Sequence, residues 1–235
     1  KKIVFLTGTR AEFGKLSSLM DSVESDNTFE CHIFVTGMHT LEKYGNTFDE
    51  IQKKGYKNIT VFHNQTDGNQ QDLVLARTIT GFSEYVKRIS PDMIIVHGDR
   101  IEALAGAIVG SFNNILVSHI EGGEISGTVD ELIRHAVSKL SHIHFTANDE
   151  ATERLIQLGE SKNSIFTIGS PDIHVMTNVE LPTINEVLNH YEIPFKDFGV
   201  FIFHPVTTEL DTLAEQINEV VLSLIESDKN FIVIY

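Results

Sequence analysis

Acidic side chains follow two neighbouring apolar runs of this 235-residue chain, where they could transfer protons or stabilise a developing positive charge. One run ends in His97-Gly98-Asp99-Arg100 with Glu102 after it, and the next ends in His119-Ile120-Glu121-Gly122-Gly123-Glu124. If the two runs are adjacent strands, five carboxylates gather at one sheet edge: Asp99, Glu121, Glu124, Asp130 and Glu131. Crowded carboxylates raise one another's pKa values, which separates an acid from a base. Helix caps and solvated helix starts are the alternative interpretation.

The first apolar run leads into a glycine turn, Gly8-Thr9-Arg10-Ala11-Glu12-Phe13-Gly14-Lys15-Leu16. A P-loop needs four residues between its glycines and a Ser or Thr after its lysine, so this segment is not a P-loop. The chain also lacks the G-x-G-x-x-G of a dinucleotide site. The start of the following helix favours an anion such as phosphate, with Arg10 and Lys15 nearby. An ordinary turn with solvated cations explains the same pattern.

The histidines add two candidate features. His142 and His144 alternate on one predicted strand, but the chain has neither H-E-x-x-H nor a cysteine pair, so we expect no metal site. His204 follows a later apolar run as His204-Pro205-Val206-Thr207-Thr208, and we expect it to face the first domain across an interdomain cleft. Thr207 or Thr208 as a helix cap is the plainer interpretation of that segment.

Short apolar runs bounded by Gly, Asp or Asn predict strands, and segments of helical period between them predict helices. The expected strands are Ile3–Leu6, His32–Val35, Ile59–Phe62, Met93–Val96, Ile115–Ser118, His142–Phe145 and Ile165–Ile168. The expected helices are Ala11–Val23, Thr40–Lys54, Gln71–Arg88, Ile101–Phe112, Val129–Leu140 and Asp149–Leu158. This alternation predicts an α/β fold with a Rossmann-type, doubly wound parallel sheet. Such sheets bind ligands beyond the carboxyl ends of their strands.

A second unit is expected after a first domain of residues 1–175. Residues 176–196 lack a strand pattern and contain two prolines, which predicts a linker with one short helix at Ile184–Leu188. In residues 197–235 the pattern restarts as strand Gly199–Phe203, helix Thr207–Ser227 and strand Phe231–Tyr235. One βαβ unit cannot bury both faces of a sheet, so we expect it to be the start of an incomplete second α/β domain.

Composition excludes several classes of protein. Hydrophobic residues make up 41% and charged residues 22%, which is typical of a soluble globular protein. The net charge of −15, without a Lys/Arg cluster, argues against a nucleic-acid partner. The single cysteine cannot form an internal disulfide, and no apolar stretch approaches the roughly 18 residues of a membrane span. We therefore expect a cytoplasmic protein that does not contact a membrane.

Taken in order, these segments resemble the UDP-N-acetylglucosamine 2-epimerase family, whose members have a two-domain GT-B architecture. The matching pieces span almost the whole chain: Gly8–Glu12 with Lys15, Gly98–Arg100 with Glu102, His119–Glu124, Ser126–His135, Gly169–Asp172 and His204–Thr208. The non-hydrolysing branch typically has His-Val-Glu-Ala-Gly-Leu-Arg. By contrast, His119–Glu124 and Ser126–Glu131 resemble the hydrolysing branch of sialic acid synthesis.

The resemblance implies an enzyme that acts on a UDP-sugar and releases UDP with N-acetylmannosamine or a 2,4-diacetamido analogue. Elimination through a 2-acetamidoglucal, followed by hydration, needs no cofactor. The resemblance implies that the catalytic residues are Asp99, Glu121, Asp130, Glu131 and His204. It implies that the substrate-binding residues are Arg10, Lys15, Arg100, Glu124, Arg134, His135 and Ser170, with Lys15 and Arg100 holding loops in place. It also suggests a homodimer.

Two other classes stay open from the sequence alone. A non-hydrolysing UDP-sugar 2-epimerase or a GT-B glycosyltransferase would leave no free mannosamine. A non-catalytic nucleotide-sugar binding module would bind without turnover. The sequence does not distinguish the substituent on carbon 4 of the sugar, nor does it assign the acid and the base among the carboxylates.

Overall fold

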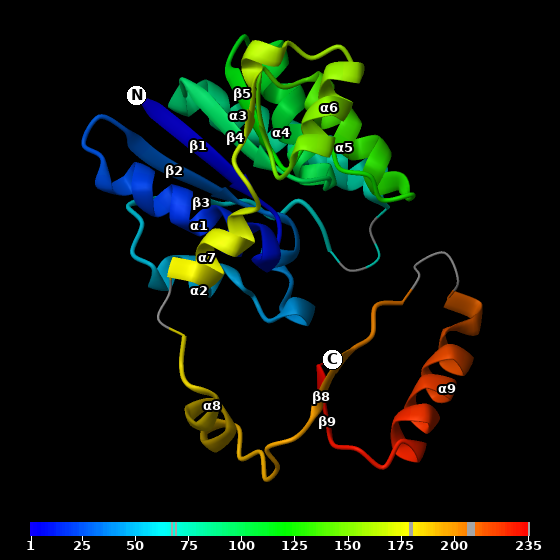
Figure 1. Cartoon of the computed structure of the whole chain (residues 1–235). Coiled ribbons are helices and arrows are strands. Elements are labelled where there is room, and N and C mark those ends of the chain that lie inside the picture. The colour runs from blue at the N-terminus through cyan, green and yellow to red at the C-terminus, as the bar shows by residue number, and fades with distance from the viewer. Residues whose placement is uncertain (67, 69, 179–180, 206–209, 235) are drawn as a thin grey trace. The chain divides into compact units, whose positions relative to one another are not determined.

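The chain divides into two compact units, which are described separately. The computed structural model describes residues 1–66, 68, 70–178, 181–205 and 210–234. By the proximity of Cα atoms, Lys1–Val179 form the first unit and Glu180–Tyr235 the second (Figure 1). The expected linker, residues 176–196, therefore begins inside the last helix of the first unit, α7 (Pro171–Asn178).

Seven strands form one parallel sheet in the first unit. They are β1 (Lys2–Thr7), β2 (Glu30–Val35), β3 (Asn58–Val61), β4 (Met93–His97), β5 (Leu116–Ile120), β6 (Ile143–Thr146) and β7 (Ile165–Thr167). Their order is β3-β2-β1-β4-β5-β6-β7, and every neighbouring pair is parallel. The predicted α/β class is thus confirmed. The strand order reverses between β1 and β4, and ligands of such sheets bind at that reversal.

Helices connect these strands, and side-chain caps determine where several of them begin. The helices are α1 (Arg10–Ser25), α2 (Phe48–Lys53), α3 (Gln71–Ile89), α4 (Ile101–Phe112), α5 (Val129–Lys139) and α6 (Asp149–Gln157). Thr9 and Glu12 form a reciprocal capping box at α1. The side chains of Thr128 and Asn148 cap α5 and α6. Because the caps satisfy backbone N–H groups just after the strands, they fix the loops at the carboxyl edge of the sheet.

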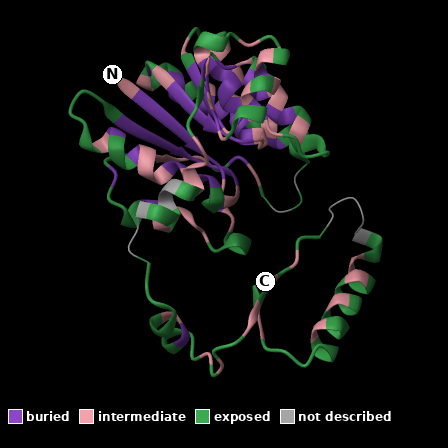
Figure 2. Ribbon diagram, viewed as in Figure 1, coloured by how far each residue is buried: buried purple, intermediate pink, exposed green. Residues whose placement is uncertain are grey.

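The sheet carries a hydrophobic core on each face, since successive strand side chains point to opposite sides. Val4 and Leu6 of β1 belong to a core shared with α3, α4 and α5. Ile3 and Phe5 belong to the opposite core, which α1 and α2 cover. Figure 2 shows the buried residues concentrated in the strands and on the inner faces of these helices. Both faces of the strands near the reversal are therefore buried, and their carboxyl ends are rigidly placed.

Three sequence predictions for the first unit need correction. The expected helix Thr40–Lys54 is wrong: the segment forms two 3-10 turns, at Gly37–Thr40 and Glu42–Tyr44, and then α2. Gly45 and Asn46 have φ values of 80° and 47°, which an α-helix cannot contain. Strand β5 ends at Ile120, two residues later than expected. Helix α7 is absent from the prediction. The other predicted strands and helices of this unit are confirmed, with small shifts at their ends.

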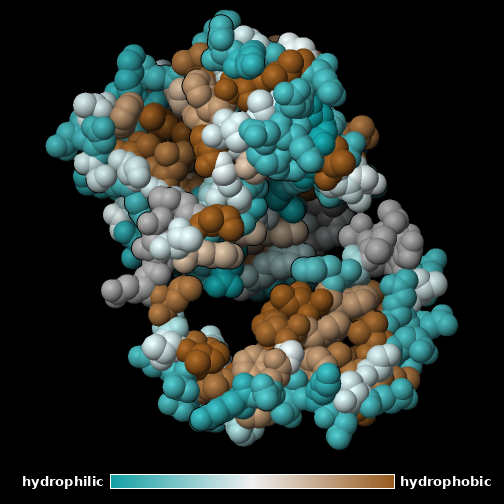
Figure 3. Space-filling view, viewed as in Figure 1, coloured by the Kyte–Doolittle hydropathy of each residue, from teal (hydrophilic) through white to brown (hydrophobic). Residues whose placement is uncertain are grey.

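The second unit contains a pair of parallel strands and two helices among its described residues. The elements are α8 (Ile184–His190), β8 (Gly199–Ile202), a 3-10 turn (Leu210–Thr212), α9 (Leu213–Glu226) and β9 (Phe231–Ile234). The predicted helix Thr207–Ser227 begins later than expected, and its residues 207–209 lie outside the described part, as do Val206 and Tyr235. Figure 3 shows hydrophobic side chains gathered over the strands and α9 of this unit.

A helix that crosses a bilayer needs about 18 or more predominantly apolar residues. Within the part of the chain that the structure describes, no helix is both long and apolar enough to cross a membrane.

Candidate active site

The candidate site lies at the carboxyl ends of β1, β4 and β5, next to the reversal of strand order. Strands β4 and β5 pair directly, with His97 opposite Ile120, as the proposal of adjacent carboxylate-bearing strands requires. The residue after each strand end is held by backbone hydrogen bonds: Gly98 N donates to Ile120 O, and Glu121 N donates to Phe145 O. The two loops that carry Asp99 and Glu121 are therefore anchored to the neighbouring strands.

Glu121 is the most heavily contacted carboxylate of this edge. Its Oε2 atom accepts from Lys15 Nζ at 2.7 Å and lies 3.0 Å from His97 Nε2. Its Oε1 atom accepts from Ser170 Oγ at 2.9 Å. The same Lys15 ammonium lies 3.3 Å from Asp172 Oδ2 in α7. Helix α1, strand β4 and the segment between β7 and α7 thus converge on one carboxylate, and Lys15 joins that carboxylate to α7.

The surroundings of Glu121 hold it ionised. Burial alone would raise its pKa, but the hydrogen bond and charge of His97, with the hydrogen bonds of Lys15 and Ser170, lower the pKa to about 2. Crowding among carboxylates was expected to raise such pKa values, and for Glu121 this expectation is wrong. The reason is that its contacts are cationic and hydroxyl donors rather than other acids.

Asp99 is held by a buried arginine. Its Oδ2 atom accepts from Arg134 Nη2, and Arg134 Nη1 donates to Glu124 O at 3.1 Å and lies 3.4 Å from Ser126 Oγ. The Arg134 side chain is 11% exposed and that of Asp99 is 28% exposed. One guanidinium therefore fixes both the Asp99 carboxylate after β4 and the loop after β5, which joins three of the predicted site residues.

Glu131 and Asp130 lie at the start of α5 and have different contacts. Glu131 Oε2 accepts from the N–H groups of Ser126 and Gly127 at 2.8 and 2.9 Å, and these bonds lower its pKa. The expected raised pKa is therefore wrong for Glu131 as well. Asp130 is exposed, and its Oδ2 atom accepts from Thr128 Oγ1 at 3.0 Å. Glu131 organises the loop, whereas the Asp130 carboxylate faces solvent.

The remaining predicted residues of this loop have structural contacts. Glu124 Oε1 accepts from Asn148 Nδ2 at 2.8 Å, which ties the loop to the start of α6. His135 Nε2 lies 3.9 Å from Glu131 Oε1.

The fully buried His119 has a pKa lowered to about 3, chiefly by burial. The carbonyl of Gly98 accepts from its Nε2, so the neutral ring accepts at Nδ1 from Ser138 Oγ.

The glycine turn after β1 binds a carboxylate of its own chain. Glu12 Oε2 accepts from Gly8 N at 2.7 Å and from Thr9 N at 2.9 Å, while Glu12 N donates to Thr9 Oγ1. Glu12 thus occupies the N–H groups of Gly8 and Thr9, just before α1, and the anion site expected at the start of the helix stays a prediction. Arg10, expected to meet a phosphate, lies on the surface with its Nε atom 3.2 Å from Glu50 Oε2.

A second buried carboxyl group lies beside this turn. The Glu102 side chain is fully buried, and its Oε2 atom lies 3.3 Å from Arg100 Nε. Burial raises the pKa of Glu12 to about 7, and the charge of Glu102 adds to the rise. Gly37, with φ 63°, passes so close that a Cβ there would lie 2.6 Å from Glu102 Oε1. The turn is therefore tightly packed around two acids.

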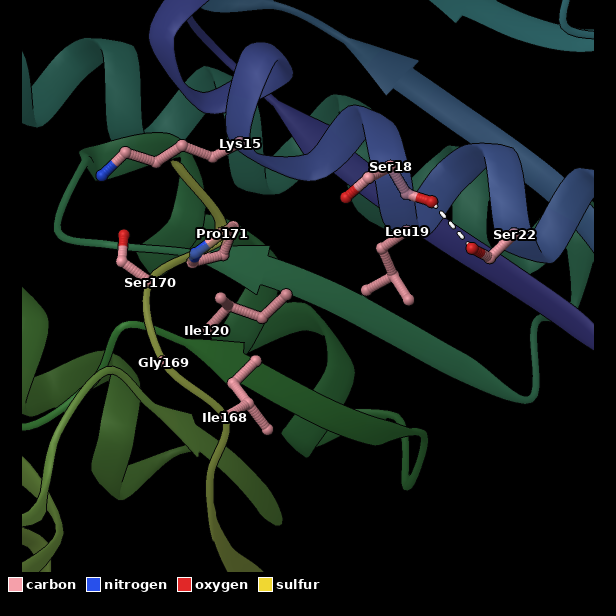
Figure 4. A pocket seen from close by; sticks show the side chains of 9 residues that line it. All are labelled: Lys15, Ser18, Leu19, Ser22, Ile120, Ile168, Gly169, Ser170 and Pro171. Carbon is pink, nitrogen blue, oxygen red and sulfur yellow. Dashed lines mark hydrogen bonds between the residues drawn. The ribbon is translucent and has the colours of Figure 1, made fainter. Parts of the chain in front are cut away.

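A hollow of about 260 Å³ opens between α1 and the segment that links β7 to α7. Figure 4 shows Lys15 and Ser170 at one end, with Ile120, Ile168 and Leu19 further along. The hollow therefore adjoins the two donors of Glu121 that come from outside the β4–β5 pair. Its other wall residues are small or apolar.

Three of the residues that contact the site were absent from the predicted set: His97, Glu12 and Asp172. His97 begins the same motif that supplied Asp99, and its place at the carboxyl end of β4 is the signal that could have found it. His204 is exposed in the second unit, and its expected role across a cleft stays a prediction. Among the described residues, no group of three or more His, Cys, Asp or Glu side chains is placed to bind a metal ion.

The sequence is similar to a known protein family and to named bacterial proteins. A family model described as UDP-N-acetylglucosamine 2-epimerase matches residues 21–235. A protein of Neisseria meningitidis serogroup B named UDP-N-acetylglucosamine 2-epimerase is 47% identical over 235 residues, which cover all of this chain and 62% of that protein. A Legionella pneumophila protein named UDP-N,N'-diacetylbacillosamine 2-epimerase (hydrolyzing) is 35% identical, covering 99% of this chain and 63% of that protein.

A solved structure shares the fold. The crystal structure of a UDP-GlcNAc 2-epimerase from Neisseria meningitidis, bound to UDP-GlcNAc, superposes with a TM-score of 0.85 at 18% identity. The match covers 99% of this chain and 65% of that one. This likeness confirms the predicted GT-B-like fold class. The chain spans less than two thirds of the length of each of these three proteins.

Proposed function

The chain belongs to the UDP-N-acetylglucosamine 2-epimerase family, and from that premise we propose that it is part of a hydrolysing epimerase. The proposed substrate is UDP-N-acetylglucosamine or a 2,4-diacetamido analogue, and the proposed products are UDP and the free sugar of mannose configuration. The name of the Legionella relative, a hydrolyzing 2-epimerase, and the His119–Glu124 segment support the hydrolysing branch. The observation that carries the proposal is the set of fixed carboxylates after the paired strands β4 and β5.

The reaction places two demands on such a site. In the first step the bond between carbon 1 and the diphosphate oxygen breaks, a base takes the hydrogen of carbon 2, and a double bond forms between these carbons. In the second step water adds to carbon 1, and an acid returns a proton to carbon 2 on the opposite face. Positive charge develops at carbon 1 when the diphosphate leaves. The site must therefore supply a fixed negative charge and groups that exchange protons.

The environments of the carboxylates suit different parts of this chemistry. Glu121 has a pKa of about 2, so it stays ionised at neutral pH but is a weak base. We assign it the stabilisation of the positive charge. Asp99 and the solvent-facing Asp130 are the candidates for proton transfer, with Glu131 shaping the loop before α5. The assignment of acid and base between Asp99 and Asp130 stays open.

The departing diphosphate needs cations or N–H donors. We propose Arg10 for this task, because it is exposed at the start of α1, and we propose His204 from the second unit. Lys15, Arg100, Glu124, Arg134, His135 and Ser170 are proposed to shape the substrate site through the loop contacts described above. A homodimer and a cytoplasmic location stay part of the proposal.

Incubation of the full-length gene product with UDP-N-acetylglucosamine in heavy water tests this proposal. Phosphorus NMR follows free UDP, and proton NMR follows the hydrogen on carbon 2. We expect free UDP, free N-acetylmannosamine and deuterium at carbon 2. Accumulation of UDP-N-acetylmannosamine would indicate a non-hydrolysing epimerase. Binding of the UDP-sugar without turnover would indicate a binding module. Transfer of the sugar to an added acceptor would indicate a glycosyltransferase.

A further inference from the structure

His97 contacts the central carboxylate of the site but has no role in the proposal above. It is the last residue of β4, and its side chain is 7% exposed. Its Nε2 atom lies 3.0 Å from Glu121 Oε2. Its Nδ1 atom is buried without a hydrogen-bond partner among the described residues. Burying a polar nitrogen without a partner costs free energy, so the contact made by the other nitrogen deserves a functional explanation.

The Glu121 side chain leaves the sheet from an unusual backbone conformation. Its φ value is 59°, in the left-handed region that non-glycine residues seldom occupy. Such strain persists only where surrounding contacts impose it. The contacts that fix the carboxylate come from three elements: Lys15 in α1, Ser170 after β7 and His97 in β4. Of these, only His97 belongs to a strand that pairs with β5.

The protonation of the imidazole follows from its partner. Glu121 is an acceptor, because its carboxylate is ionised, and Nε2 must therefore carry a hydrogen. If the ring is neutral, the unpartnered Nδ1 atom carries only a lone pair. If the ring is a cation, Nδ1 carries a second buried N–H group. The titratable groups that interact electrostatically with His97 include Glu121, Glu12 and the neutral His119. Lys15 shares the same carboxylate oxygen, and Asp172 faces Lys15.

We propose that His97 is a positioning residue, whose Nε2–H holds the Glu121 carboxylate at the orientation that the reaction requires. The inference rests on the proposed function for its catalytic consequence, since Glu121 must act in the reaction for its orientation to matter. The positioning depends on the hydrogen bond from Nε2 and does not require a change in the protonation of the ring. A side chain that presents an N–H at the same place should therefore replace histidine in part.

The first test measures Glu121 itself and does not depend on turnover. The carboxyl carbons of 13C-labelled glutamate are titrated by NMR in the full chain, and Glu121→Gln identifies the signal. His97→Leu removes the donor, and His97→Gln keeps an amide N–H at about the reach of Nε2. We expect the pKa of Glu121 to rise by about one unit or more in His97→Leu and by less in His97→Gln. An unchanged Glu121 titration in folded His97→Leu would overturn the proposal.

The second test concerns the reaction, in the full-length gene product. We expect His97→Leu to lower kcat for UDP release about a hundredfold, with KM changed severalfold at most, and His97→Gln to recover at least about tenfold of that loss. Equal losses in both variants would contradict a hydrogen-bond role. A wild-type protein without turnover would refute the proposed function, while the NMR titration would still decide whether His97 orients Glu121.

Discussion

Two regions of the same sheet edge bury glutamates in opposite ways. After β4 and β5, Glu121 receives donors from two basic side chains and a hydroxyl, and its pKa is lowered to about 2. After β1, Glu12 receives two backbone N–H groups beside a second acid, and its pKa is raised to about 7. Burial disfavours ionisation in both regions: at Glu12 it is the largest influence on the pKa, whereas at Glu121 the donors from His97, Lys15 and Ser170 outweigh it. Fixed charge is thus available in the first region, whereas the second serves to build the turn.

The largest expected effect comes from the region with cationic contacts. Asp99→Asn removes the negative charge that Arg134 holds but keeps the shape of the side chain. We expect UDP release by the full-length gene product to fall roughly a thousandfold, because a charged group at the reacting centre is lost. Circular dichroism should show a retained fold. Turnover near the wild-type rate would remove Asp99 from the catalytic set.

A smaller effect is expected when one cation of the same region is removed. Lys15→Met leaves Glu121 with His97 and Ser170 as donors and leaves Asp172 without its ion pair. We expect UDP release to fall about tenfold to a hundredfold, since a donor to the fixed carboxylate is lost. Lys15→Arg is the matched control, because it keeps the charge. If Lys15→Met and Lys15→Arg were equally active, the cation would not be what fixes Glu121.

The two regions should also respond to pH with opposite signs. The folded pKa of Glu12 is raised from 4.5 to about 7, so its contribution to stability is full below pH 4.5 and is lost as the pH rises through 7. The folded pKa of Glu121 is lowered from 4.5 to about 2, so its contribution is present above pH 4.5 and is lost as the pH falls toward 2.

Urea unfolding of this chain at pH 5 and pH 8 measures the first of these contributions. Relative to wild type, Glu12→Gln should gain free energy of unfolding between pH 5 and pH 8, by up to about 3 kcal/mol, because glutamine does not ionise. Glu121→Gln should show no such gain over the same range. An identical pH dependence in wild type and Glu12→Gln would show that the Glu12 carboxyl is not the titrating group.

The smallest effect is expected in the loop before α5. Glu131→Ala removes the acceptor for the N–H groups of Ser126 and Gly127. Those two amides should exchange with heavy water faster than in wild type, while amides of the core strands keep their protection. Unchanged exchange at both amides would mean that the Glu131 carboxylate does not hold the loop. Glu131 would then be a candidate for proton transfer.

The fold followed from the sequence wherever apolar periodicity was strong. All seven strands of the first unit were predicted, since each is a short run rich in apolar residues, and the central ones are buried by the two cores. The helix expected over Thr40–Lys54 failed, because its period continued across Gly45 and Asn46, whose left-handed backbone ends it. Helix α7 was missed, because its stability comes from packing against α1 rather than from its own pattern.

The site was predictable as a set of residues but not as a set of contacts. The motifs around Asp99 and Glu121 identified the correct sheet edge, since residues after parallel strands meet there. Sequence spacing did not show that Arg134 reaches Asp99 or that Lys15 reaches Glu121, because those contacts cross from one element to another. Nor did it show that Glu12 turns back to accept from the N–H group of Gly8.

The central claim is that negative charge at Glu121, and not at the more deeply buried Glu12, serves the reaction. The most direct test is the initial rate of UDP release from UDP-N-acetylglucosamine by full-length Glu121→Gln and Glu12→Gln side by side. We predict a loss of roughly a thousandfold for Glu121→Gln and of about threefold at most for Glu12→Gln. Equal rates in the two variants, or a greater loss in Glu12→Gln, would contradict the account.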